Sequence, residues 1–340
     1  MQGNPTQAEE ARPIISVVMA TCNGARFLPQ QLDSIARQTQ LPDELVVGDD
    51  ASTDATRDLI RDFARCNPGI EVQLEENSRR IGSTANFDAT VRRARSDIVV
   101  FSDQDDEWLP HRIERLVTAL EGDPQASYAF SDGILIDEAG RAIDGSLFMT
   151  VDFTARDRKL FSSGGGLHVL MRRNVVTGAT LAVRRNTLET LLPFERGWIH
   201  DYYMVLALEC LGHGVVVDEP LIRYRLHSGQ QVGLAKPSRA AALAVARKQT
   251  ASYCIAEAER FEGLGARLAA MGVSPDHEVF ALARAKAQFI RARARMRQHP
   301  FGAPFLIVSE LLRGSYRRYS QGWKQVVVDL LAAMIGCFDR

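Results

Sequence analysis

The sequence predicts an α/β protein with a mostly parallel central sheet flanked by helices and a helical C-terminal extension. Before about residue 120, short apolar runs rich in β-branched residues alternate with segments of helical periodicity, which is typical of strand–helix–strand units in a parallel sheet. After about residue 237 the composition shifts to Ala, Arg, Leu and Glu, still with helical periodicity. We therefore expect a short disordered leader at residues 1–12, an α/β domain over residues 13–235 and a helical region over residues 236–340.

Four strands are expected before residue 102, and a helical pattern follows each of them. Ser52 or Thr53 is expected to cap the second helix, and Pro110 suits the first turn of the fourth. The third helix should follow a turn at Gly82 and run to about Arg95. The expected strands cover residues 14–19, 44–48, 70–74 and 98–101.

The pattern between residues 127 and 235 is less regular. Residues 160–174 contain three consecutive glycines and fit either a loop or a short helix. A helix is expected over residues 200–212, ended by Gly212. Strands are expected within residues 127–137, 177–186 and 215–227, and breaks between the C-terminal helices near residues 272–275 and 299–304.

The composition argues against several classes of protein. The formal net charge is -1, so no overall positive field attracts nucleic acid. The five cysteines lie far apart and lack the spacing of zinc ligands or of a disulfide framework, which fits a reducing compartment. The N-terminal segment lacks the apolar core of a signal peptide, and no run approaches the roughly 20 apolar residues of a membrane-spanning helix. The best candidate for such a helix, residues 326–338, is short and contains Asp329. We therefore expect a cytoplasmic protein.

Acidic residues follow two of the expected strands. The run FSDQDDEW (residues 101–108) places four carboxylates in five positions after the fourth strand, and Asp49-Asp50 follow the second. Ligands of parallel sheets bind beyond the carboxyl ends of the strands, so both groups should face one crevice. Carboxylate oxygens are ligands that Mg²⁺ or Mn²⁺ prefers, often together with substrate phosphates. The spacing Asp103-x-Asp105 suits a metal that bridges a diphosphate; the alternative is a solvated acidic turn whose acids cap the next helix.

Four stretches carry a more specific signal: ISVVMATCNGARFLPQQLDSI (15–35), ELVVGDDASTDAT (44–56), NSRRIGSTANF (77–87) and VFSDQDDEW (100–108). In this order and at these separations, they resemble the family-2 glycosyltransferases of the GT-A fold. The resemblance covers roughly residues 13–235. The motifs DQDDxW, HD and YRxHxxQxxG are most similar to those of bacterial rhamnosyltransferases that build surface polysaccharide.

The resemblance implies a single α/β catalytic domain that binds a nucleoside diphosphate sugar. Thr21 falls where the family contacts the nucleoside, with shaping of the turn after the first strand as the alternative. Asp50 matches the carboxylate that accepts a hydrogen bond from the N3–H of a pyrimidine. Arg80 lies where relatives place a basic residue near the nucleotide, and a surface ion pair is the alternative. Asp103 is expected near the ribose or the metal, and Asp105 on the metal itself.

Transfer with inversion requires one base that faces the acceptor hydroxyl. Relatives carry this base in a Glu-Asp pair. The corresponding pair here is His200-Asp201, whose first residue departs from the usual Glu, so Asp201 is expected to be the catalytic base and the role of His200 stays open. The alternative is that Asp201 only caps the following helix. His227 is expected to complete the site for Mg²⁺ or Mn²⁺, as a late His does in many GT-A enzymes; a structural His is the alternative. The metal would offset the diphosphate charge as the leaving group departs.

The resemblance implies transfer of L-rhamnose from dTDP-L-rhamnose to a saccharide or lipid-linked saccharide of cell-surface polysaccharide. The same fold with a UDP-hexose donor is the first alternative. A nucleotidyltransferase would need a GxGxR-type loop after the first strand, which TCNGAR (21–26) matches poorly. A non-catalytic nucleotide-sugar binder would have lost either the metal carboxylates or the base.

The helical region lies beyond the family's motifs. Its basic segments carry aromatic residues, as in FIRARARMRQHPF (289–301) and LLRGSYRRYSQGWKQVV (311–327). Packing on the catalytic domain or pairing in a homodimer is favoured over peripheral contact with the inner face of the cell membrane, and all three stay open. Nucleic-acid binding is not expected, because the basic residues are spread over several elements.

Overall fold

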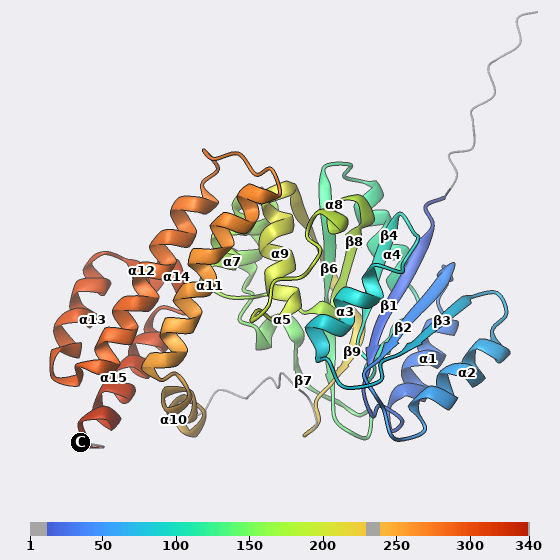
Figure 1. Cartoon of the computed structure of the whole chain (residues 1–340), viewed down its shortest axis with the longest axis horizontal. Helices are drawn as coiled ribbons and strands as arrows, with labels where there is room; N and C mark the ends of the chain where they lie inside the picture. The colour runs from blue at the N-terminus through green and yellow to red at the C-terminus, as the bar shows by residue number, and fades with distance from the viewer. Residues whose placement is uncertain (1–11, 229–238, 339–340) are drawn as a thin grey trace, which may run out of the picture.

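The computed structural model describes residues 12–228 and 239–338. Figure 1 shows a sheet domain beside a group of helices that forms the C-terminal part of the chain. Most of the expected leader at residues 1–12 and the expected domain boundary at residue 235 fall outside the described residues, so both stay predictions.

The central sheet has a parallel half and a mixed half. Its strand order is β3-β2-β1-β4-β8-β6-β9-β5, and β7 pairs with β6. Pairing is parallel from β3 through β4 and between β6 and β9, and antiparallel at β4–β8, β8–β6, β6–β7 and β9–β5. The first half confirms the four expected strands. The strands are β1 (Ile15–Thr21), β2 (Glu44–Asp49), β3 (Glu71–Glu76), β4 (Ile98–Ser102), β5 (Glu107–Trp108), β6 (Ala126–Ile136), β7 (Ala142–Ser146), β8 (Leu181–Arg184) and β9 (His213–Arg225).

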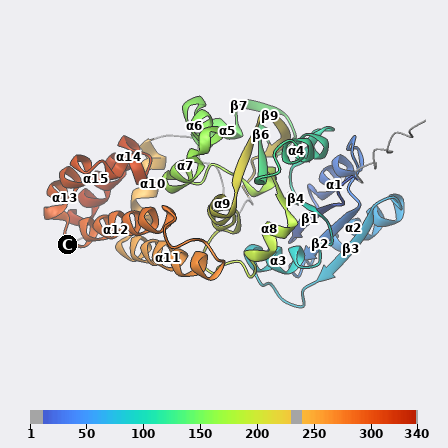
Figure 2. The same cartoon turned by 90° about the horizontal axis from the view of Figure 1, so that it is seen from above.

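Helices cover both faces of this sheet, and each face has its own hydrophobic core. Side chains alternate across a strand, so Val18 of β1 belongs to one core and Val17 to the other. The first core includes side chains of α3 (Ser83–Val91) and α9 (His200–Leu211), and the second those of α1 (Leu28–Ala36), α2 (Thr56–Cys66) and α4 (Arg112–Glu121). Figure 2 shows α3 and α4 on opposite sides of the strands.

One expected helix cap and one expected first-turn residue are wrong. Helix α2 begins at Thr56 after Ala55, which makes no side-chain cap, and Ser52 instead donates a hydrogen bond to Asp49. Helix α4 begins at Arg112, two residues after Pro110. A capping side chain and a turn-closing side chain have the same residue type, so the sequence alone does not separate them. The remaining short elements are α5 (Leu147–Thr150), α6 (Ala155–Leu160), η1 (Phe161–Gly165), α7 (Gly166–Arg172), η2 (Gly178–Thr180) and α8 (Arg185–Thr190). Residues 160–172 are therefore helical, with a kink at Ser163 and Gly164.

The C-terminal region consists of helices that pack on the sheet domain. Lys286 of α12 donates hydrogen bonds from Nζ to the Met171 carbonyl oxygen (2.8 Å) and to Tyr202 Oη (3.1 Å). Both expected breaks are present, between α11 and α12 and between α12 and α13. The helices are α10 (Arg239–Lys248), α11 (Ala251–Ala270), α12 (Val279–Gln298), η3 (Pro300–Gly302), α13 (Ala303–Leu312), α14 (Ser315–Tyr319) and α15 (Trp323–Phe338).

Asp329, in the middle of apolar helix α15, joins this helix to α12. It is fully buried and accepts hydrogen bonds from Arg293 Nε (3.1 Å), Arg297 Nη2 (2.8 Å) and Tyr316 Oη (2.9 Å). Burial alone would raise the pKa of this carboxyl group, but the charges of the two arginines outweigh burial and hold the pKa below its ordinary value. Within the described residues, no helix is both long and apolar enough to cross a bilayer.

Candidate active site

Asp49, the last residue of β2, is a structural carboxylate. It is fully buried and accepts hydrogen bonds from Thr21 Oγ1 (3.0 Å), the Ser52 amide (2.9 Å) and Arg57 Nε (2.7 Å). Burial raises its pKa, but the bonds from Ser52, Arg57 and Thr21 outweigh this effect, and the pKa lies below its ordinary value. Thr21 is therefore engaged with Asp49 through its hydroxyl, and its contact with a nucleoside stays a prediction.

Asp50 organises the loop before α3. Its Oδ1 accepts a hydrogen bond from the Ile81 amide (2.7 Å) and its Oδ2 accepts one from the Gly82 amide (2.9 Å). Arg80 sits in this loop with an exposed side chain, and its charge opposes the rise that burial causes in the pKa of Cys22, just after β1. Asp50 and Arg80 thus lie together at the carboxyl ends of β1 and β2.

The acidic run after β4 forms a compact group. Asp103, Asp105 and Asp106 each offer a carboxylate oxygen, and these three atoms lie within 4.8 Å of one another. Asp106 is buried; its Oδ1 accepts a hydrogen bond from the Arg225 amide (2.9 Å), and its Oδ2 has no partner in the described structure. Asp106 therefore faces the other acids and does not cap α4.

Burial and the neighbouring negative charges raise the pKa values of Asp103 and Asp106. Burial first, then the charges of Asp105 and Asp201, raise the pKa of Asp103 to about 7. Burial and the charges of Asp105 and Asp103 raise the pKa of Asp106 well above its ordinary value. Three carboxylates in this space are therefore difficult to ionise together without an added positive charge.

Arg112 supplies one such charge from beneath the cluster. It has no exposed surface, donates from Nη2 to the Phe101 carbonyl oxygen (3.0 Å), and stacks over Trp108 at 4.1 Å. Burial lowers the pKa of Arg112 to about 9, while Asp106 and Asp103 act in the opposite direction. The sequence interpretation missed this residue, because an arginine in an amphipathic helix pattern gives no sign that it points inward. Trp108 packs in the core, where it is 5% exposed.

Strand β9 brings the distant His227 to the acidic cluster. His227 Nε2 lies 2.7 Å from Asp105 Oδ2, and the imidazole ring packs on Phe27 with a centroid separation of 4.9 Å. Arg225, 2% exposed, donates from Nη2 to Glu107 Oε1 (2.6 Å) and from Nε to the Asp105 carbonyl oxygen (2.8 Å). Arg225 therefore holds the acidic loop against β9 and places His227 beside a predicted metal ligand.

Asp201 lies in the first turn of α9. Its Oδ2 accepts a hydrogen bond from the Gly178 amide (3.1 Å), and its Oδ1 accepts one from Asn174 Nδ2 (3.1 Å). The N-cap of α9 is Ile199, so Asp201 is not the N-cap residue. A Cβ atom on Gly178 would lie 3.1 Å from His200 Nε2 and 3.4 Å from the Asp201 Cβ, so glycine permits this close approach. His200 is buried, and burial lowers the pKa of its imidazole against the opposing charge of Asp201.

The carboxylates from β4 and α9 lie close enough to act electrostatically on the same groups. Burial is the main cause that raises the pKa of Tyr224 above its ordinary value, and the negative charges of four carboxylates add to it: Asp106, Asp103, Asp105 and Asp201. Asp201 also contributes to the raised pKa of Asp103, which is 98 positions away in the sequence (201 − 103). The structure therefore brings Asp103, Asp105, Asp201 and His227 together, with Asp50 and Arg80 at the neighbouring strand ends.

The donor set fits a hard divalent cation. Three clustered carboxylates, one of them with a buried oxygen that lacks a partner, and a neighbouring imidazole are the groups that bind Mg²⁺ or Mn²⁺. Asp103 and Asp105 are the predicted ligands. The geometry adds Asp106 to them, because the same cluster contains it and the sequence interpretation assigned it only to a helix cap or a supporting position.

We expect the stability of the metal-free protein to fall as the pH rises from about 4 to about 7. The pKa of Asp103 is raised above its ordinary value of 3.8 to about 7, so its contribution to stability is complete below pH 3.8 and is lost as the pH rises through about 7. One pKa unit corresponds to about 1.4 kcal/mol, and solvent near this partly buried group reduces the effect, so we expect a loss on the order of 2 kcal/mol. Urea unfolding across this pH range measures it.

Mn²⁺ should reverse this loss at pH 8, because a bound cation favours ionised carboxylates. Asp103→Asn is the matched comparison. Burial also raises the pKa of Glu209 to about 7, so Glu209 titrates in the parent and in Asp103→Asn alike. The informative quantity is therefore the difference between the two proteins in the pH dependence of their unfolding free energy. Equal pH slopes for the two proteins would contradict the assignment to Asp103.

Comparisons with known sequences identify similar glycosyltransferases. Residues 16–172 match the family described as glycosyl transferase family 2. The dTDP-rhamnosyl transferase RfbG of Shigella flexneri is 25% identical over 230 residues, covering 63% of this chain and 73% of that protein. The putative teichuronic acid biosynthesis glycosyltransferase TuaG of Bacillus subtilis is 26% identical over 163 residues, covering 48% of this chain and 63% of that protein. An uncharacterized glycosyltransferase of Nostoc sp. is 29% identical over 221 residues, covering 63% of this chain and 65% of that protein. The chain thus spans slightly less than two thirds of the length of TuaG and of the Nostoc protein.

Solved structures share the fold. TarS of S. aureus in complex with UDP has a TM-score of 0.52 and 14% identity, with 96% of this chain and 91% of that chain covered. The mannosyltransferase PcManGT from Pyrobaculum calidifontis, in complex with GDP-Man and Mn²⁺, has a TM-score of 0.50 and 19% identity, with 97% and 89% covered. At these identities the likeness concerns the fold, and it confirms the expected GT-A class.

Proposed function

Since this chain belongs to glycosyl transferase family 2 through its residues 16–172, we propose that it is an inverting, divalent-metal-dependent glycosyltransferase. The observation that carries this proposal is the convergence of Asp103, Asp105 and Asp106 from the end of β4, Asp201 from α9 and His227 from the end of β9. A nucleoside diphosphate sugar carries its negative charge at the diphosphate, and an acidic cluster can bind that charge only through a cation. Mn²⁺ in the PcManGT structure supports the same use of a metal here.

Residues at the ends of β1 and β2 are proposed to bind the nucleoside. The Asp50 carboxylate has two oxygens, each with more than one acceptor site, so the bonds from the Ile81 and Gly82 amides leave capacity for a pyrimidine N3–H. Thr21 lies beside it at the end of β1, and the exposed Arg80 can reach a nucleotide phosphate. Asp103, Asp105 and His227, together with Asp106, would hold the metal, which would supply Lewis-acid stabilisation of the leaving diphosphate.

Asp201 is proposed to act on the acceptor. The Gly178 amide and Asn174 Nδ2 each bond one of its oxygens, which fixes the orientation of the carboxylate while further acceptor sites remain. The acceptor hydroxyl transfers its proton to Asp201 as its oxygen forms a bond to the anomeric carbon. The bond from that carbon to the diphosphate oxygen breaks, and the electron pair leaves with the nucleoside diphosphate. Attack opposite the leaving group inverts the anomeric configuration.

The proposed donor is dTDP-L-rhamnose, and the proposed acceptor is a saccharide or lipid-linked saccharide of cell-surface polysaccharide, used at the cytoplasmic side. The similarity to RfbG, described as a dTDP-rhamnosyl transferase, supports this donor. The similarity to TuaG, described in teichuronic acid biosynthesis, supports the role in surface polysaccharide. A UDP-hexose is the second candidate, because TarS shares the fold and was solved with UDP.

A panel of nucleotide sugars tests the proposal. The purified chain is incubated with dTDP-L-rhamnose, UDP-glucose, UDP-galactose or UDP-N-acetylglucosamine, with and without Mn²⁺ or Mg²⁺, and release of nucleoside diphosphate is followed. We expect metal-dependent release from dTDP-L-rhamnose. If only a UDP-hexose releases nucleoside diphosphate, the proposed donor is wrong and the proposed type of reaction is retained. Tight binding without release from any donor, with acceptor present, would contradict the enzymatic proposal, and pyrophosphate formation from dTTP and a sugar 1-phosphate would indicate a nucleotidyltransferase.

A further inference from the structure

Two neighbouring helices of the C-terminal region expose large apolar side chains. On the segment formed by η3 and α13 they are Phe301, Phe305, Val308 and Leu312, and three of them are at least 80% exposed. On α15 they are Trp323, Val327, Leu330 and Met334, with Trp323 at 73%. Isolated apolar residues are common on protein surfaces, but contiguous groups of this size mark interaction sites.

Each group lies on one face of its helix. The members are separated by 4, 3 and 4 positions in both groups, and at about 100° per residue such positions fall within about 60° of one another. The opposite face of each helix is in a hydrophobic core, as Ala303 and Ile307 of α13 and Val328 and Ala332 of α15 show. The helices are therefore apolar on two sides, and only one side is covered within the described structure. We call the eight exposed residues the apolar face.

The exposed charges of this region are positive. Residues 299–338 contain two acids, Glu310 and Asp329, and both are buried. Glu310 pairs with Arg313 (3.0 Å), and Asp329 pairs with Arg293 and Arg297. The exposed bases of the same residues are Arg313, Arg317, Arg318 and Lys324.

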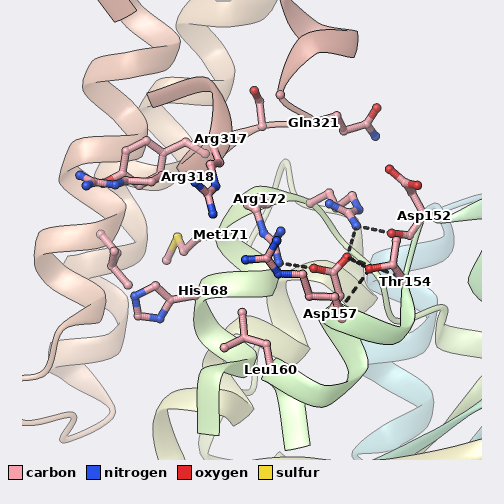
Figure 3. A pocket seen from close by; sticks show the side chains of 16 residues that line it. Asp152, Thr154, Asp157, Leu160, His168, Met171, Arg172, Arg317, Arg318 and Gln321 are labelled. Atoms are coloured by element: carbon pink, nitrogen blue, oxygen red, sulfur yellow. Dashed lines mark hydrogen bonds and ion pairs between the residues drawn. The ribbon is translucent and has the colours of Figure 1, made fainter. Parts of the chain in front are cut away.

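A basic cavity lies directly beside the apolar face. It has a volume of about 710 Å³ and is formed between α6–α7 and α14 (Figure 3). Figure 3 shows Arg317 and Arg318 across the cavity from Arg172, whose guanidinium is paired with Asp157 at 2.6 Å. Within residues 12–228 and 239–338, neither Arg317 nor Arg318 has an ion-pair partner. Lining residue Gly322 immediately precedes Trp323, so the cavity and the start of α15 are adjacent in the chain.

We propose that the apolar face rests on a membrane that contains anionic lipids, with the bases of α14 at the headgroup phosphates. Aromatic and aliphatic side chains bordered by lysine and arginine are the pattern of an interfacial helix, which lies in the plane of the membrane without crossing it. A second copy of the chain fits less well, because a two-fold interface would bring the same basic surface against itself. This inference goes beyond the proposed reaction and does not depend on it.

Trp323 is a built-in reporter for the test. The other two tryptophans, Trp108 and Trp198, are 5% and 7% exposed, so a change in emission on vesicle binding comes mainly from Trp323. The full chain is titrated with phosphatidylcholine vesicles and with vesicles that also contain phosphatidylglycerol. We expect a blue shift and co-sedimentation with the anionic vesicles, weakened by salt, and no shift in Trp323→Phe despite retained binding.

Variants separate the apolar from the electrostatic contribution. Phe305→Glu/Leu312→Glu should abolish co-sedimentation, and Arg317→Glu/Arg318→Glu should weaken it about tenfold or more. Leu41→Glu, an exposed leucine on the sheet domain, is the matched control and should bind as the parent does. Circular dichroism verifies that each variant is folded.

Three results would overturn the proposal: no binding to anionic vesicles, equal binding to both vesicle types, or a loss of binding in Leu41→Glu equal to that in Phe305→Glu/Leu312→Glu.

Light scattering without lipid measures whether the chain forms a dimer. The parent chain could form a dimer that Phe305→Glu/Leu312→Glu dissociates, and it could at the same time fail to bind vesicles. That result would assign the apolar face to contact with a second copy and refute the membrane proposal. Nucleotide-sugar turnover measured on the same samples reports separately on the proposed reaction.

Discussion

Asp105→Ala is expected to reduce turnover by about 10²–10³-fold and to remove its response to Mn²⁺ or Mg²⁺. Asp105 lies in the carboxylate cluster and also holds His227 at 2.7 Å, so its loss removes one predicted metal ligand and releases another. The remaining acids keep the negative charge that repels a diphosphate without the site that binds the compensating cation. Initial rates at increasing metal concentration, with the best donor of the panel, measure both effects.

The control for this variant is Asp33→Ala, which removes an acid from the exposed surface of α1. It should retain the parental rate and the parental metal response. Normal metal-stimulated turnover in Asp105→Ala would show that the cation, if one acts, binds elsewhere. If the rate falls but the response to metal is unchanged, Asp105 is not a metal ligand and acts only in the folding of its loop.

Asp201→Asn is expected to lower kcat by about 10²–10⁴-fold while donor affinity stays within about threefold of the parent. The amide keeps the size of the side chain but is not a base, so the acceptor hydroxyl retains its proton. The proposed donor site lies at the strand ends of β1, β2 and β4, which this substitution does not alter. Transfer of labelled sugar reports kcat, and calorimetry with the nucleotide sugar reports affinity.

The two hydrogen bonds of Asp201 require a check on folding. Both partners, the Gly178 amide and Asn174 Nδ2, are donors, so the amide nitrogen of an asparagine would face one of them. Thermal unfolding establishes that the variant is folded, and Asn174→Ala, which removes one partner and leaves the carboxylate, should retain most of its activity. Full transfer by Asp201→Asn would place the base on another residue.

Local features of the chain were predictable because they depend on neighbouring residues. The alternation of apolar runs with helical periodicity located β1 to β4, and the glycine and proline breaks separated α11, α12 and α13. The acids that follow β2 and β4 were expected at one edge of the sheet, since parallel strands place their carboxyl ends together. The expected cap of α2 was wrong because Ser52 bonds a carboxylate in its own turn, a choice that residue type does not reveal.

The sequence by itself therefore determined β1 to β4, the helices that follow them, the acidic strand ends and the GT-A class. Only the tertiary structure decided which side chains meet: His227 with Asp105 across 122 positions, Asp201 with Asp103, and Arg112 under the cluster. It also decided which apolar helix face is covered and which, on α13 and α15, is exposed. The physical reason is range: periodicity is set by residues a few positions apart, whereas these contacts follow from how β8, β6 and β9 pair and where the C-terminal helices pack.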